Sequence, residues 1–121
     1  MIKIGDLIYI PELHFGGTDD LPAREGIVIT CCEASKFIKV ELPNKFIIPL
    51  WKIEQGSRWY TQGTFDELAS DIANSQQPEQ FIYESIKNGD NPLFILQVLR
   101  KTQPQLWLKL KQKIRAINTI V

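Results

Sequence analysis

The sequence has few of the residues that catalysis and metal binding usually require. Its only histidine is His14, so a Ser-His-Asp triad, a Cys-His pair or a multi-histidine metal site would have to be built around this one position. The two cysteines, Cys31 and Cys32, are adjacent, and in a strand their side chains point to opposite faces, which disfavours a disulfide or a shared metal. We therefore expect no catalytic set of residues, no metal site and no cofactor.

Long apolar segments are also missing. The longest apolar runs, 46–51 and 93–96, fall far short of the roughly 20 residues that a membrane-spanning helix needs. Residues 1–6 lack the basic head and the apolar stretch of a secretory signal. Hydrophobic residues make up 44% of the chain and charged residues 23%, which is typical of a globular domain with its own core. The sequence predicts a cytoplasmic protein without a membrane partner.

Charge is distributed unevenly, although the formal net charge is zero. Residues 61–90 carry a net charge of −5, whereas residues 91–121 carry +6 and contain no acidic residue. The basic segment can bind an acidic protein surface or the phosphates of a nucleic acid. Alternatively, its charges face water or form ion pairs with the acidic helices that precede them.

The first 54 residues show the short alternating patterns of β-strands. Residues 12–24 are rich in glycine and acidic residues, have no apolar period and indicate a long loop between the first two strands. Pro49 is expected to interrupt the chain between the last two strands. The five expected strands are 3–10, 26–32, 36–42, 45–48 and 50–54.

Five short strands, a long first loop, a tight hairpin and a proline before the last strand resemble an SH3-like small barrel. Within that class, the segment Gly5 to Ile10, the glycine-rich loop and Arg24 before residues 27–30 resemble the opening of the MazF/PemK-type toxin fold. Members of that family are ribonucleases, and they usually have a proline where this chain has Glu25. The resemblance implies a barrel and, as an alternative function, an active or degenerate ribonuclease with Arg24 and His14 in its cleft.

The second half predicts three or four helices. Thr64 and Glu67 have the spacing of a capping box at the start of the first helix. A second helix is expected at 78–88 and a very apolar third one after Asn91, while the last helix is expected from Thr102 or the residue after it. We therefore predict an α+β protein. Its expected parts are an SH3-like five-stranded barrel at 1–54, a linker at 55–63 and a helical layer at 64–121, packed on the barrel or beside it.

Aromatic and basic side chains are the candidates for binding a partner. Near the first loop and the last strand of a small barrel, aromatic rings can grip an extended peptide or stack on bases, or they can instead pack the helices against the barrel. In the last helix, tryptophan and basic side chains can contact an acidic partner. The candidate residues are Tyr9, Phe15, Trp51, Trp59, Tyr60, Trp107, Lys109, Lys111, Lys113 and Arg115.

These patterns favour a non-catalytic binding or adaptor protein that recruits a protein partner through the barrel-edge aromatics, the basic last helix, or both. A nucleic-acid-binding regulator that uses the basic helix is an alternative, as is the ribonuclease that the toxin resemblance implies. The apolar segment 93–99 is compatible with a buried helix and with a homodimer interface alike.

Overall fold

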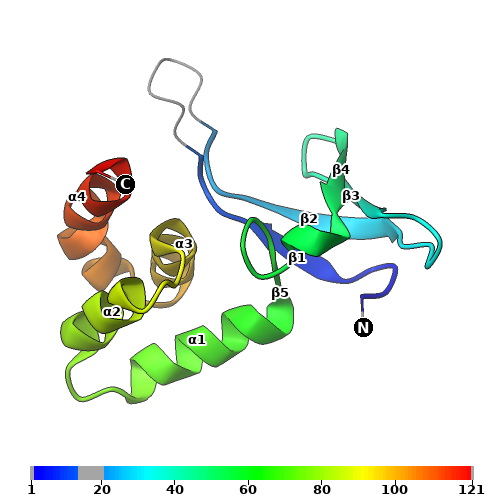
Figure 1. Cartoon of the computed structure of the whole chain (residues 1–121). Helices are drawn as coiled ribbons and strands as arrows, with labels where there is room; N and C mark the ends of the chain where they lie inside the picture. Colours follow the sequence, from blue (N-terminus) through cyan, green and yellow to red (C-terminus); the bar gives the residue numbers. More distant parts are fainter. Residues whose placement is uncertain (1, 14–20, 121) are drawn as a thin grey trace. The chain divides into compact units, whose positions relative to one another are not determined.

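The computed structural model describes residues 2–13 and 21–120, and it places strands first and helices after them (Figure 1). The α+β class predicted from the sequence is therefore confirmed. The chain divides into two compact units after Phe65, within the first helix. None of the helices in the described ranges combines the length and the apolar character that crossing a bilayer requires.

The first unit is built on one antiparallel sheet, in the strand order β4-β3-β2-β1-β5. The strands are β1 (Leu7–Ile10), β2 (Arg24–Thr30), β3 (Phe37–Glu41), β4 (Ile47–Trp51) and β5 (Tyr60–Thr61). This sheet is open, so the predicted closure into a barrel is wrong. The edge strand β5 has only two residues before the chain enters a helix, whose backbone amides bond within the helix and not to a further strand.

Alternate side chains of the strands form the core of the first unit, as the period of two predicts. The indole of Trp59 closes this core, and its side chain is only 1% exposed. Full burial of one such aliphatic or aromatic side chain contributes about 1.5–3 kcal/mol to folding. The core residues are Ile8, Ile10, Val28, Ile38, Val40, Leu42 and Trp59.

Pro49 lies in the middle of β4. The prediction that it separates two strands is therefore wrong. The amide of Leu42 donates to the carbonyl of Phe46 at 2.8 Å, and the amide of Lys52 donates to that of Lys36 at 2.9 Å. Because hydrogen-bonded pairs alternate along an antiparallel ladder, the even-numbered residues of β4 bond to β3. The nitrogen of Pro49 therefore faces the free edge, where a missing N–H costs the ladder nothing.

The fifth strand also differs from the prediction. After Trp51 the chain forms a short 3-10 helix, η1 (Lys52–Glu54), in place of the expected strand at 50–54. The fifth strand is β5, which falls inside the predicted linker at 55–63 and pairs with β1 through Ile8 opposite Thr61 and Tyr9 opposite Tyr60. A two-residue strand is too short to leave a periodic pattern, and only its pairing with a distant strand defines it.

Four helices follow the sheet: α1 (Gln62–Asn74), α2 (Pro78–Lys87), α3 (Pro92–Thr102) and α4 (Pro104–Ile120). The capping box predicted at Thr64 is wrong, because the hydroxyl of Thr61 accepts from the amide of Thr64 at 3.3 Å and the helix begins between them. The α3 cap is as predicted: Asn91 Oδ1 accepts from the amide of Leu93 at 2.9 Å. Every residue at 93–99 is buried, which agrees with the interpretation of this segment as a buried helix.

Candidate binding surfaces

Three of the predicted aromatic candidates belong to the interior. Tyr9, Trp59 and Tyr60 are all buried. The ring of Tyr9 stacks on that of Phe65 with centroids 4.2 Å apart, and its hydroxyl donates to Gln62 Oε1 at 2.9 Å. These three rings therefore leave little surface for a partner to contact. A fourth candidate, Phe15, lies outside the described residues.

Among the described aromatic candidates of the first unit, Trp51 is the accessible one. It ends β4 opposite Phe37 of β3, and 46% of its surface is exposed. The two rings are tilted by 41° with centroids 4.0 Å apart, an arrangement that stabilises an aromatic pair beyond simple burial. From the interior, the indole N–H of Trp59 donates to the carbonyl of Trp51 at 2.8 Å. Trp51 is therefore held by neighbours on two sides while part of its ring faces solvent.

Further exposed apolar side chains lie on the same face of the sheet. Ile47 pairs with Glu41, which pairs in turn with Ile27, and directly paired residues share a face. Ile27 and Ile47 are both exposed. Near β1 the same face is covered by the Tyr9–Phe65 stack, whereas on β2, β3 and β4 its side chains are exposed or half-buried. We call this second part the outer sheet face; it comprises Ile27, Phe37, Lys39, Glu41, Ile47, Pro49 and Trp51.

The free edge of β4 is poorly suited to accept an additional strand. Strand addition needs alternating amide donors and carbonyl acceptors along the edge. Pro49 has no amide hydrogen on this edge, and the outward carbonyl of Trp51 already accepts from Trp59. A partner at the outer sheet face is therefore recognised through side chains and not by strand pairing.

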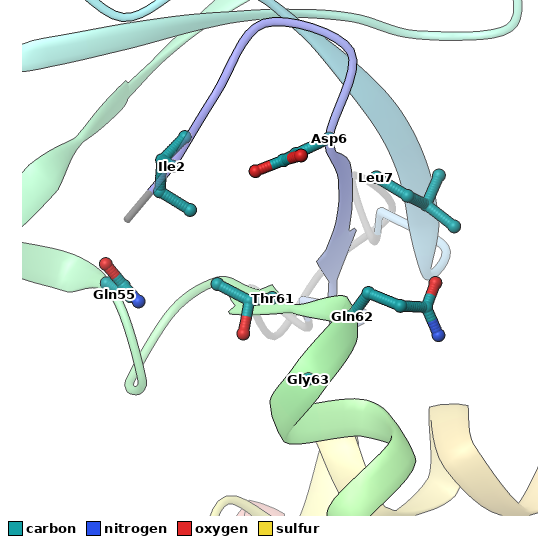
Figure 2. A pocket seen from close by; sticks show the side chains of 7 residues that line it. All are labelled: Ile2, Asp6, Leu7, Gln55, Thr61, Gln62 and Gly63. Atoms are coloured by element: carbon teal, nitrogen blue, oxygen red, sulfur yellow. The ribbon is translucent and has the colours of Figure 1, made fainter.

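A separate concavity of about 280 Å³ lies where α1 begins. Figure 2 shows the Asp6 side chain directed into the space between Ile2 and Thr61. Asp6 accepts from the backbone amide of Lys3 at 2.8 Å, and the Thr61 hydroxyl contacts that of Thr64 at 3.2 Å. Asp6 is the one ionisable side chain among the described lining residues, so the lining offers a single carboxylate among polar groups. The lining residues are Ile2, Asp6, Leu7, Gln55, Thr61, Gln62 and Gly63.

Of the two residues that the toxin resemblance implies for a ribonuclease cleft, Arg24 and His14, the structure describes only Arg24. Arg24 opens β2 opposite Ile10, and burial lowers the pKa of its guanidinium. His14 lies outside the described residues. Within the described ranges, no three or more histidine, cysteine, aspartate or glutamate side chains gather where they could hold a metal ion.

The basic residues of α4 divide between two sides of the helix. Lys109 and Lys113 are four residues apart and share one side. Lys109 forms an ion pair with Glu79 of α2, and this hydrogen bond lowers the pKa of Glu79. Lys113 adds a weaker electrostatic attraction to the same carboxylate. On this side, the prediction that the basic charges meet the acidic helices is confirmed for Lys109.

The other side of α4 carries a different arrangement. Trp107, Lys111 and Arg115 follow each other at intervals of four residues and so share a side. The half-buried Trp107 ring has Lys111 Nζ 4.7 Å and Arg100 Cζ 5.0 Å from its centroid. Leu108, next to this side, is 53% exposed. Arg100 was not among the predicted residues, because it comes from α3, across the turn between the two helices.

Comparison of the chain with protein-family models, with curated proteins and with solved structures finds no match in any of the three. No relative therefore assigns a role to the outer sheet face, to the concavity at α1 or to the surface of α4. The arguments for function rest on the exposure, charge and positioning of the side chains described above.

Proposed function

We propose that this chain is a non-catalytic binding protein, an adaptor that recruits a protein partner through the outer sheet face with Trp51 as the anchor. The observation that carries the proposal is the partly exposed Trp51 ring, which packs at a tilt on Phe37 while its backbone carbonyl accepts a hydrogen bond from Trp59. Tryptophan is among the residues most enriched in the energetic centres of protein interfaces. The proposal retains one residue of the predicted aromatic set and replaces its buried members with the neighbours of Trp51.

The composition of the outer sheet face supports a protein partner. Ile27 and Ile47 extend the exposed apolar surface beyond Trp51, and contiguous exposed apolar residues mark interaction sites. Lys39 and Glu41 lie between them on β3 and offer one charge of each sign. An apolar contact area with a few polar groups that fix orientation is the usual composition of a protein interface.

The positioning of Trp51 also favours binding. Ordering a long side chain at an interface costs about 0.5–1.5 kcal/mol. Because Phe37 already packs on this ring and the backbone carbonyl of Trp51 is already bonded, less of that cost falls on complex formation. Trp51 is therefore a preorganised anchor.

The test is affinity capture of the full-length protein from its native lysate after nuclease treatment, with quantification of the captured partner. Trp51→Ala is expected to reduce capture by at least about tenfold, the loss typical of an interface anchor. The matched control is Ile53→Ala, because Ile53 is 88% exposed two residues away but lies in η1, outside the strands of the outer sheet face.

Equal capture by the two variants would contradict the proposal. Light scattering of the purified protein tests the other occupant of this face, a second copy of the chain. A dimer that Trp51→Ala converts to a monomer would replace the adaptor with a homodimer. The nucleic-acid-binding and ribonuclease alternatives stay predictions, as does the cytoplasmic location.

A further inference from the structure

We infer that the second unit carries an anion-binding site formed by Arg100, Trp107 and Lys111, and that its ligand is an acidic peptide segment of a partner protein. This site is separate from the outer sheet face, and the inference does not depend on the function proposed for that face. It concerns side chains of α3 and α4 only, which pack against each other within the second unit.

Two cations converge on one indole ring. Arg100 lies in the last turn of α3, and Trp107 and Lys111 lie in the first half of α4. The guanidinium carbon and the ammonium nitrogen are 5.0 and 4.7 Å from the ring centroid, within the range of cation–π attraction. The two side chains therefore place two positive charges around one ring, and an anion is attracted to such a concentration of charge.

No carboxylate of the described chain neutralises this pair of charges. Residues 91–121 contain no acidic side chain, and within the described ranges neither Arg100 nor Lys111 forms an ion pair. Lys109 is the internal comparison, because its charge is matched by Glu79. The dipole of α3 favours Arg100 at the helix end, but it does not account for Lys111 in the middle of α4. The two charges are therefore available to an acidic ligand from outside.

An apolar contact adjoins the two cations. Leu108 is 53% exposed and is three residues from Lys111, so the two side chains are neighbours on the helix surface. A peptide that combines carboxylates with an apolar side chain can therefore meet both parts of the site at once. Such a combination is more specific than charge alone, because the apolar residue fixes which carboxylates meet the cations.

The geometry favours a peptide over a nucleic acid. Single-stranded nucleic acids bind by stacking bases on open aromatic faces and by running their phosphates along a row of cations. The Trp107 ring is half buried and already has two cations over it, which a stacked base would have to displace. The row of cations along α4 is interrupted, because Lys109 is occupied by Glu79, whose carboxylate repels phosphate. A compact cluster of charges fits a short acidic segment better.

The test uses fluorescence anisotropy with the full-length protein and three fluorescein-labelled probes. The first is a seven-residue peptide of glutamates with a central leucine, the second is the same peptide with glutamines, and the third is an oligothymidylate. We expect binding of the acidic peptide, weaker at higher salt, and no binding of the glutamine peptide. Lys111→Gln and Arg100→Gln should each weaken binding by about fivefold or more, as expected for the loss of one charge-assisted contact.

Lys109→Gln is the matched control, because it removes the same charge from the side of α4 that faces Glu79. Its effect should remain below about twofold, since that charge is already neutralised. Circular dichroism checks that all variants are folded. Equal losses in Lys109→Gln and Lys111→Gln would overturn the site in favour of diffuse attraction. Binding of the oligothymidylate alone, or of none of the probes, would also overturn it.

Discussion

Trp59 donates its indole N–H to the backbone carbonyl of Trp51 at 2.8 Å, so a buried tryptophan fixes the backbone of an exposed one. The two residues lie on either side of η1, and the bond closes the segment between β4 and β5. This hydrogen bond therefore links the core of the first unit to the surface that we propose for binding.

Trp59→Phe is expected to destabilise the protein. The change removes the donor to the Trp51 carbonyl and leaves space in the core, and together these effects should cost about 1–3 kcal/mol of unfolding free energy. Urea unfolding followed by circular dichroism measures this loss. Trp51→Phe is the control, because it retains the carbonyl and keeps an aromatic ring at the surface, and it should cost less. Equal stabilities of Trp59→Phe and wild type would show that the bond is unimportant for folding.

Gly26→Ala tests how closely two strands approach each other. A Cβ at Gly26 would clash with Val40 Cγ1 and lie 3.0 Å from the Glu41 carbonyl oxygen, so the Val40 side chain or the strands β2 and β3 would have to shift. Overpacking of this kind costs about 1–3 kcal/mol.

Gly63→Ala provides the opposite case. A Cβ at Gly63, in the first turn of α1, meets only the Thr61 hydroxyl at 3.9 Å. Alanine there reduces the freedom of the unfolded chain and should stabilise the protein by roughly 0.4–1 kcal/mol. Thermal unfolding of both variants is the measurement. A Gly26→Ala protein as stable as Gly63→Ala would contradict the tight strand contact.

Glu79→Gln tests the ion pair between α2 and α4. The hydrogen bond from Lys109 lowers the pKa of Glu79, so its stabilising contribution is present above the ordinary glutamate pKa and is lost as the pH falls through the lowered value. The pKa of Lys109 is raised by the same bond, so its contribution is complete below the ordinary lysine pKa and is lost as the pH rises through the raised value.

We therefore expect Glu79→Gln to be less stable than wild type at neutral pH, by an amount that shrinks toward strongly acidic pH and in high salt. Thermal unfolding across pH and salt measures it. Asp71→Asn, an exposed change that removes a carboxylate from α1, serves as the control and should be close to wild type in stability at neutral pH. A difference between Glu79→Gln and wild type that persists in strong acid would mean that packing of the side chain, and not its charge, accounts for the effect.

Local signals predicted the helices better than the strands. Asn91 marked the start of α3, and α2 (Pro78–Lys87) ends within one residue of the predicted 78–88, just before Gly89 at a φ of 104°. Both signals act within one turn of the chain. The effect of Pro49 depends instead on which residues of β4 bond to β3, a property of the paired strands that the proline itself does not encode.

The exposure of the binding candidates also depends on strand pairing and helix packing that local sequence signals do not encode. Trp51 and Trp59 are both aromatic residues near the end of the sheet, and no local pattern distinguishes the half-exposed ring from the buried one. Their exposure follows from the strand pairing and from the path of η1 between them. Arg100 was missed for a related reason, since its contact with Trp107 requires two helices to fold back on each other.

Pro49 has a further consequence for the chain before it folds. Residues 46–51 form one of the longest apolar runs in the sequence, and without a proline such a run has the composition of segments that assemble into intermolecular β-sheets. A proline in the run acts as a gatekeeper against aggregation. Because Pro49 lies where the native sheet needs no amide, it interrupts this apolar run at no cost to the hydrogen-bond ladder of the folded protein.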